Sequence, residues 1–219
     1  WGHNRSGQVG VPTSMVYATT PVAVGYPVGA SAPLSFKSIS AGGSQTCGLT
    51  IANEQYCWGY GIGAQPAYQT GGVNGVSVAV GFSCSLYSSW SVECSRNPPG
   101  SQPYFPWAYL GPATTAEHVC AITNTGDTWC WGDNHNNKLG NGPMYSGRTQ
   151  VLIANTTLNS VSTGFDHTCG LAVQVAYCWG GNSHGELGIA NSVGFSGTPR
   201  EIKLVRLHAT PKGRDKIIT

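Results

Sequence analysis

Short alternating or β-rich runs, each folded back around a turn, are the dominant pattern of apolar and polar positions along the chain. Two of them read TCGLT-IANE-QYCWG at 46–59 and VCAIT-NTGD-TWCWG at 119–132. Apolar residues do not recur at i, i+3, i+4 and i+7 over three turns, which argues against helical repeats. Further strands are expected at 36–39 and 161–162, and in Pro-bearing runs at 19–24 and 197–205. The pattern predicts all-β units of about four short strands each.

These strands belong to an internal repeat. Three segments align without gaps, WGHNRSGQVG at 1–10, WGDNHNNKLG at 131–140 and WGGNSHGELG at 179–188, and a degenerate copy, WGYGIGAQP, starts at Trp58. A second stretch recurs as SISAGGSQTCGLT at 38–50 and SVSTGFDHTCGLA at 160–172, with weaker copies at 78–86 and 114–122. The first cysteines of successive units lie 37, 36 and 49 residues apart. Such periods are typical of propellers and solenoids.

The eight cysteines form four pairs with nearly constant spacing. The pairs are Cys47 with Cys57, Cys84 with Cys94, Cys120 with Cys130, and Cys169 with Cys178. Each pair brackets a predicted hairpin, in which residues equidistant from the turn face each other at a distance that suits a disulfide. One cross-strand bridge is therefore expected in each of four units. Because such bridges persist in oxidising compartments, they indicate an extracellular protein, secreted or at the cell surface.

A zinc site is the competing interpretation of the cysteines. Structural zinc sites prefer C-x₂₋₄-C pairs, and the chain has none. His118 and His167 stand two residues before a cysteine, but the equivalent residue of the first unit is Gln45. A hydrogen bond from the strand to a neighbouring loop explains Gln and His equally well. No metal and no cofactor are expected.

The sequence also contains no recognisable set of catalytic residues. The chain lacks a G-x-S-x-G elbow, a phosphate-cradling glycine loop and an H-E-x-x-H motif. Glu54, Glu93 and Asp127 fall in or beside predicted hairpin turns, where capping and solvation explain them. Asp166-His167 and Glu117-His118 are acid–histidine neighbours, but adjacent strand residues point to opposite faces. No catalytic residue is assigned, and the chain is not expected to be an enzyme.

Composition and charge narrow the class of protein further. Only 9% of the residues are charged, and there are 31 Gly and 13 Pro, which excludes coiled coils, helical bundles and solvated disorder. Residues 200–219 contain six Lys and Arg and two Asp and Glu, whereas residues 1–199 contain five Lys and Arg and seven Asp and Glu. Because the body of the chain has no excess of positive charge to bind phosphate, no nucleic-acid partner is expected. No apolar run approaches the about 18 residues of a membrane span, so membrane insertion is not expected. The chain opens with Trp1 and shows no secretory signal, so it is expected to be a processed product or a piece of something longer.

The combined pattern G-x-x-[HQ]-T-C-G-L…Y-C-W-G-x-N-x-x-G-[QE]-L-G resembles the regulator of chromosome condensation repeat. The resemblance is strong at 36–59, 117–142 and 160–188 and weak at 60–113. Its members form β-propellers, often of seven blades. The cysteine-paired form is similar to secreted bacterial repeat proteins and to Crinkly-type ectodomains of plant receptor kinases. Exchange factors, enzyme inhibitors, photoreceptors and receptor ectodomains all share the repeat, so the resemblance implies a fold and leaves the function open.

We therefore predict a single β-propeller domain over 1–219, with about five repeat units, or an arc of a seven-bladed propeller. The expected units are approximately 11–67, 68–110, 111–148 and 149–196. Residues 197–219 and 1–10 are expected to share a fifth, closing blade, because a closed ring has no exposed sheet edge.

The function that follows is extracellular binding or structural assembly without catalysis. A protein or glycan partner would be recognised by loops on a propeller face, and self-assembly is a further option. The alternatives are a secreted inhibitor of an enzyme and, third, an enzyme that uses the central channel. The candidate contact residues are Tyr104, Phe105, Trp107 and Tyr109, in the insertion 95–110, although they could instead fill the space between blades. Asn4 and Asn155 begin glycosylation sequons.

Overall fold

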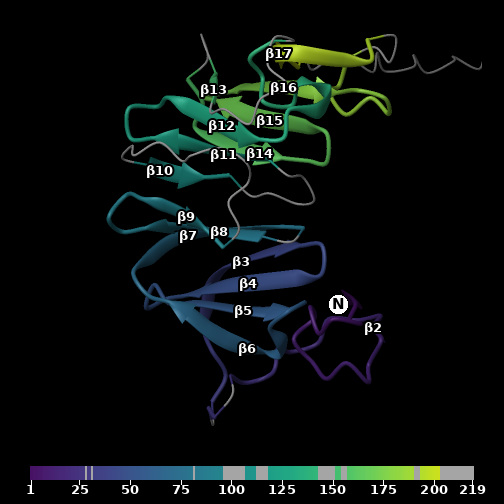
Figure 1. Ribbon diagram of the computed structural model, residues 1–219, viewed down its shortest axis with the longest axis vertical. Helices are drawn as coiled ribbons and strands as arrows, with labels where there is room; N and C mark the ends of the chain where they lie inside the picture. Colours follow the sequence, from purple (N-terminus) through teal and green to yellow (C-terminus); the bar gives the residue numbers. More distant parts are fainter. Residues whose placement is uncertain are drawn as a thin grey trace, which may run out of the picture.

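The chain folds into a stack of small antiparallel sheets in the computed structural model (Figure 1). The structure describes residues 1–27, 29–30, 32–80, 82–95, 107–111, 118–142, 151–153, 157–189 and 193–202. Four sheets follow one another in chain order, and we refer to them as blades 1 to 4. The all-β class and the propeller type of sheet predicted from the repeat are both confirmed.

Each blade is built from strands that are consecutive in the sequence. Blade 1 contains β3 (Phe36–Gly42), β4 (Gln45–Thr50), β5 (Gln55–Gly59) and β6 (Gly63–Thr70). Blade 2 contains β7 (Val73–Ala79), β8 (Phe82–Tyr87) and β9 (Val92–Cys94). Blade 3 contains β10 (Trp107–Leu110), β11 (His118–Thr123), β12 (Thr128–Gly132) and β13 (Val151–Leu152), and blade 4 contains β14 (Ser160–Thr163), β15 (His167–Ala172), β16 (Val175–Gly181) and β17 (Phe195–Glu201).

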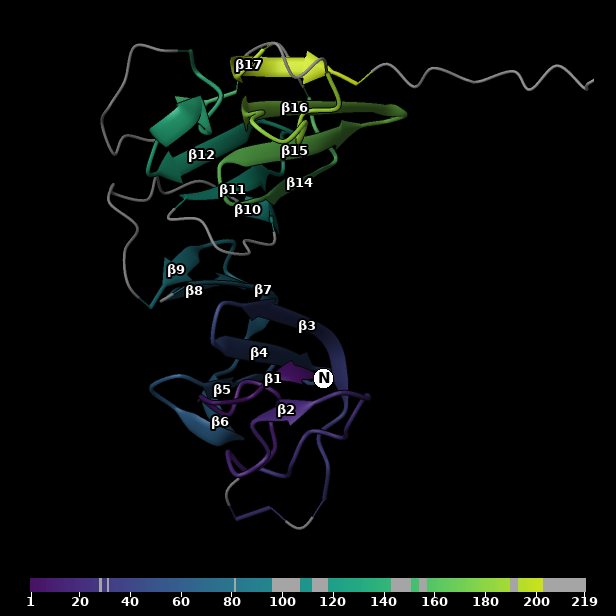
Figure 2. The same cartoon turned by 90° about the vertical axis from the view of Figure 1, so that its right-hand side faces the viewer.

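The elements outside the blades are short. A two-stranded ribbon of β1 (Gly2–His3) and β2 (Tyr17–Ala18) lies beside blade 1, and a 3₁₀ turn, η1 (His135–Asn137), follows β12 (Figures 1 and 2). Among the described residues, none of the helical segments has the length and hydropathy of a membrane span.

A disulfide joins the second and third strands of every blade. The two cysteines are direct cross-strand partners, with Cα atoms 4.0 or 4.1 Å apart, and the pairs are those expected from the repeat: Cys47–Cys57, Cys84–Cys94, Cys120–Cys130 and Cys169–Cys178. This agreement follows from hairpin geometry, because in two of these hairpins the strand pairing is centred on Ala52 and on Thr125, and each cysteine lies five residues from that centre.

The blades pack on one another through their faces. One face of each blade carries the disulfide and the apolar residue two positions after its first cysteine. Leu49, Leu86 and Ile122 hold this position in blades 1 to 3 and are 1–4% exposed, since the next blade covers them. The equivalent Leu171 of blade 4, the last in the stack, is 51% exposed. Burial of disulfides and aliphatic side chains between sheets thus forms the core.

The predicted unit boundaries need correction at more than one junction. Strand β10 (Trp107–Leu110) belongs to blade 3 and not to the second unit, 68–110, and β13 (Val151–Leu152) belongs to blade 3 and not to the fourth unit, 149–196. The fourth unit was also predicted to end too early. Residues 195–201 form β17, which pairs with β16 and completes blade 4, so this unit does not end at residue 196. The ribbon β1–β2 lies beside blade 1, at the opposite end of the stack from β17 (Figures 1 and 2). Residues 197–201 therefore do not join residues 1–10 in a shared blade. The rest of the expected closing segment, 203–219, lies outside the described residues.

Candidate functional site

One edge of the stack gathers the repeated Trp-Gly segments. In an antiparallel blade, the turn after the first strand and the segment after the third strand emerge at the same edge. This edge, which we call the loop edge, therefore carries the segments 1–10, 60–62, 131–140 and 179–188 together with the turns 43–44 and 164–166. The opposite edge carries the hairpin turns 51–54, 124–127 and 173–174.

An asparagine, fully buried in two of the three copies, holds each complete Trp-Gly segment by the same hydrogen bond. The Oδ1 atoms of Asn4, Asn134 and Asn182 accept a hydrogen bond from the backbone N–H five residues later, at 2.9 or 3.0 Å. The Nδ2 group of Asn4 also donates to three backbone carbonyls, those of Val11, Pro12 and Met15. The asparagine of the repeat is therefore a structural residue that closes the loop.

Two of these segments are hydrogen-bonded to the blade that follows them in the sequence. The carbonyl oxygen of Gln8 accepts hydrogen bonds from Trp58 Nε1 at 3.0 Å and from Thr46 Oγ1 at 2.9 Å, both in blade 1. The carbonyl oxygen of Lys138 accepts the same pair of bonds from Trp179 and Thr168 in blade 4, at 3.0 and 2.9 Å. One loop carbonyl thus satisfies two buried donors of the next blade, which explains why Thr-Cys and Cys-Trp recur together.

Three charged residues of the loop edge form ion pairs that support this framework. Lys138 is nearly buried, and its Nζ lies 2.7 Å from Asp133 Oδ2 and 3.5 Å from Asp166 Oδ1. Burial raises the pKa of Asp133, but the hydrogen bond and positive charge of Lys138 outweigh this effect and hold the pKa below its usual value. Asp166 is therefore paired with a lysine rather than placed to tune its neighbour His167.

His118 is buried between blades 3 and 4. Its Nε2 atom lies 2.7 Å from Thr168 Oγ1, and burial lowers its pKa from 6.5 to about 3. The ring is consequently neutral at physiological pH and is shielded from any substrate. Groups of three or more His, Cys, Asp or Glu that could hold a metal are absent from the part of the chain that the structure describes.

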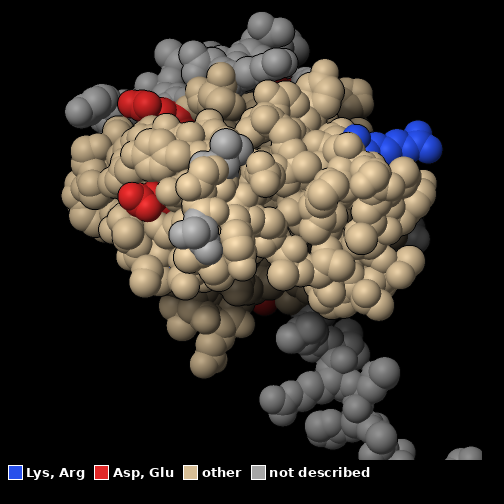
Figure 3. Space-filling model, turned by 90° about the horizontal axis from the view of Figure 1, so that it is seen from below, with Lys and Arg blue, Asp and Glu red and all other residues tan. Residues whose placement is uncertain are grey.

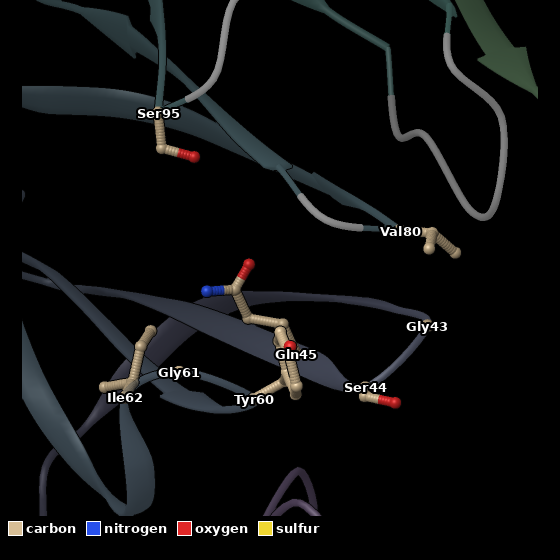
Figure 4. Close-up of a pocket in the computed structure, with 8 residues that line it drawn as sticks. All are labelled: Gly43, Ser44, Gln45, Tyr60, Gly61, Ile62, Val80 and Ser95. Atoms are coloured by element: carbon tan, nitrogen blue, oxygen red, sulfur yellow. The ribbon is translucent and has the colours of Figure 1, made fainter.

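Blade 2 departs from the pattern at the loop edge. Ser95 follows its second cysteine, at the position that Trp58, Trp131 and Trp179 hold in the other blades. A cavity of about 580 Å³ opens here between blades 1 and 2 (Figure 4). Its lining residues are Gly43, Ser44, Gln45, Tyr60, Gly61, Ile62, Val80 and Ser95. The volume lies within the range of about 300–1,000 Å³ that is usual for ligand sites.

The fold of the chain is shared with several solved propellers, although no family model matches its sequence. Human E3 ubiquitin-protein ligase HERC2 is 26% identical over 199 residues, which are 88% of this chain and 4% of that protein. Prp20p from Saccharomyces cerevisiae, also called yeast RCC1, matches with a TM-score of 0.78 and 16% identity, over 94% of this chain and 59% of that chain. The chain has the RCC1-type β-propeller fold. The ectodomain of the Physcomitrella patens receptor kinase CR4 matches with a TM-score of 0.53 and 22% identity, over 75% of this chain and 45% of that chain.

This RCC1-type chain therefore spans about three-fifths of the yeast propeller. Figure 3 shows a face of it on which most atoms belong to uncharged residues, in keeping with a composition of only 9% charged residues.

The structure corrects part of the predicted contact surface. Trp107 is 1% exposed and packs on Trp131 with ring centroids 5.7 Å apart, inside the core between blades 2 and 3. Tyr109 is half-buried against the core between blades 3 and 4, and this burial raises its pKa. Both aromatic rings therefore fill space between blades. Tyr104 and Phe105 lie outside the described residues.

The predicted glycosylation site at Asn4 is also wrong. Its side chain is 0% exposed and fully engaged with the loop, so the folded chain offers no amide nitrogen for a glycan. Asn155 lies outside the described residues and stays a prediction. The residues that line the cavity were missed, yet one signal was present in the sequence. Ser95 replaces a tryptophan that every other unit retains.

Proposed function

We propose that the chain is an extracellular protein-binding module that acts through its loop edge and performs no catalysis. The observation that carries this proposal is the set of three Trp-Gly loops, which emerge from one edge of a disulfide-bridged scaffold. In each of them an asparagine Oδ1 accepts the same hydrogen bond from a backbone N–H. Loops held by a rigid framework present a preformed surface, which lowers the entropy cost of binding.

The solved propellers support a binding role. Yeast RCC1 (Prp20) has been crystallised with Kap60, and Prp20p is described by its binding to Gsp1p and histones. The Physcomitrella protein is a receptor kinase ectodomain. Three acid and base side chains near this edge, Asp133, Asp166 and His118, are engaged in contacts within and between blades.

The disulfides support an extracellular location. In the chain-entropy model a closed loop of about ten residues contributes roughly 2.7 kcal/mol of stability, and a reducing cytosol would remove this contribution. Limited proteolysis with and without a reductant tests this part of the proposal. We expect rapid cleavage only after reduction, and equal resistance in both conditions would count against the stabilising role of the disulfides, on which the extracellular assignment rests.

The binding role is tested with an array of secreted proteins and cell-surface ectodomains, probed with the oxidised chain. Arg5→Asp and Phe165→Asp change exposed side chains of the loop edge, whereas Ile51→Asp and Val173→Asp change exposed side chains of the opposite edge. We expect partner binding to fall at least tenfold in the first pair and to persist in the second. Loss of binding only in the second pair would refute the loop edge as the binding surface.

A further inference from the structure

The cavity between blades 1 and 2 arises because two parts of the repeat are missing at one junction. The first is the indole that follows the second cysteine in the other blades, replaced in blade 2 by Ser95. The second is the loop that should reach across from blade 1. Only Tyr60, Gly61 and Ile62 separate β5 from β6, so blade 1 supplies no ten-residue segment to this end of blade 2.

A loosened junction does not explain the cavity. Beside it the two blades approach closely, since a Cβ atom on Gly42 would lie 2.3 Å from the carbonyl oxygen of Val78. Val78 also donates its backbone N–H to Ser40 Oγ of blade 1, at 2.9 Å. Blades 3 and 4 show a comparable approach, where a Cβ on Gly111 would lie 2.7 Å from Val161 O. The space is therefore local, and it lies where the junction between blades 3 and 4 has an indole and a loop segment.

The lining defines the chemistry of an occupant. None of the eight lining residues is charged, so the cavity favours a neutral group. Ile62, Val80 and the ring of Tyr60 provide apolar surface, and the Gln45 amide projects between Tyr60 and Ser95 (Figure 4). Tyr60 is 68% exposed and Val80 51% exposed, so a ligand would bury apolar surface that is now in water. This combination suits a flat apolar group with a single polar atom.

We propose that the cavity binds the indole of a tryptophan side chain supplied by a partner protein. This inference rests on the proposed function and names the partner's anchoring residue. The argument is equivalence: Trp58, Trp131 and Trp179 place an indole at this position of the repeat, and the partner would supply the one that blade 2 lacks. Tryptophan is enriched among the residues that dominate protein interfaces, because it buries a large area and directs one N–H to an acceptor.

The acceptor is available at the same place. At the complete junctions Trp58 and Trp179 donate their N–H groups to loop carbonyls, those of Gln8 and Lys138. Blade 1 presents no such loop to blade 2, and the amide oxygen of Gln45 takes its place as acceptor within the cavity. A pyranose fits less well, since its hydroxyl groups surround the ring and would face Ile62 and Val80 without partners.

The first test uses N-acetyl-tryptophanamide as the probe, added to the oxidised chain and followed by amide chemical shifts. We expect millimolar binding with shifts confined to the residues around the cavity, including Gly43, Ile62 and Val80. Gln45→Leu should weaken binding about two- to tenfold through loss of one hydrogen bond. Preferential binding of glucose or N-acetylglucosamine at the same residues would overturn the proposal.

The second test fills the cavity from within. Ser95→Trp places the missing indole on blade 2 and should reduce probe binding at least tenfold, whereas Ser89→Trp introduces the same side chain at an exposed turn of blade 2 and should leave binding unchanged. Since Ser95 Oγ accepts a hydrogen bond from Ser83 N–H, Ser95→Trp could impair folding. Val80→Lys, at a side chain already half-exposed, provides an independent block. Unchanged probe affinity in both variants would refute the site.

The two proposals fail in different ways. If a partner loses binding in Arg5→Asp and Phe165→Asp but retains it in Ser95→Trp and Val80→Lys, the loop edge is the binding surface and the indole inference is wrong. If the probe occupies the cavity and Ser95→Trp displaces it, while no ectodomain binds the loop edge, the cavity is an indole site and the proposed function is wrong.

Discussion

Lowering the pH should destabilise the chain through one buried histidine. His118 has a pKa of about 3 in the folded chain, because burial opposes its charge, and 6.5 without that environment. The unfolded chain therefore binds more protons between these two values, and stability present at neutral pH is lost as the pH falls through 6.5. Working from this shift, we expect the folded state to be about 2 kcal/mol less stable at pH 5 than at pH 7.

The assay is equilibrium unfolding of the oxidised chain in guanidinium chloride at pH 7, 6 and 5. His118→Gln removes the titrating group and should flatten the pH dependence over this range, while His3→Gln, at an exposed position, should preserve it. The lowered pKa of Asp133 adds a loss of stability only near and below its unfolded value of 3.8, outside the range measured. The reasoning is refuted if wild type and His118→Gln lose stability equally between pH 7 and pH 5.

Three further predictions concern side-chain packing and backbone strain. In equilibrium unfolding, Trp131→Phe should lower the free energy of unfolding by about 1–3 kcal/mol less than Trp179→Phe does. The Trp131 N–H is buried with no partner among the described residues, whereas the Trp179 N–H is hydrogen-bonded. Equal losses in the two variants would contradict this. Gly140→Ala should lower the melting temperature more than Gly142→Ala. Both glycines have φ near +82°, but only a Cβ at Gly140 meets an indole, at 2.6 Å, so equal shifts would exclude the clash as the cause. Val173→Asn should stabilise the chain by about 1 kcal/mol, since a β-branched residue at φ +49° is strained; no gain in an unfolding titration would count against strain there.

The hairpins and disulfides could be predicted from the sequence because they depend on local geometry. The spacing of Cys120 and Cys130 around a turn determines that they face each other, whatever the rest of the chain does. Contacts between blades could not be predicted in this way. For Trp107, in an insertion rich in aromatic residues and prolines, the sequence left two interpretations open, a partner-contact surface and filling of the space between blades. Its burial depends on Trp131 of the same blade and on the face of blade 2.

The glycosylation error at Asn4 has the same origin. A sequon is three residues long, but the accessibility of its asparagine depends on hydrogen bonds to Val11, Pro12 and Met15. The alignment of the repeat copies already pointed to a structural role for Asn4. Asn4 aligns with Asn134 and Asn182, which lie outside any sequon and make the same bond to a backbone N–H. Equivalent positions of a repeat thus predict a structural role better than a short motif predicts a modification.

The loss of the Trp-Gly segment from blade 2 has a consequence at each of its two junctions. Towards blade 1, the absent indole leaves the cavity at Ser95. Towards blade 3, Trp131 Nε1 is buried without a partner among the described residues, whereas Trp58 and Trp179 donate to loop carbonyls. A buried unsatisfied donor costs about 1–3 kcal/mol, and the Cys84–Cys94 disulfide, worth roughly 2.7 kcal/mol in the chain-entropy model, offsets it. Blade 2 thus keeps its disulfide and its strand pairing although it lacks the Trp-Gly segment.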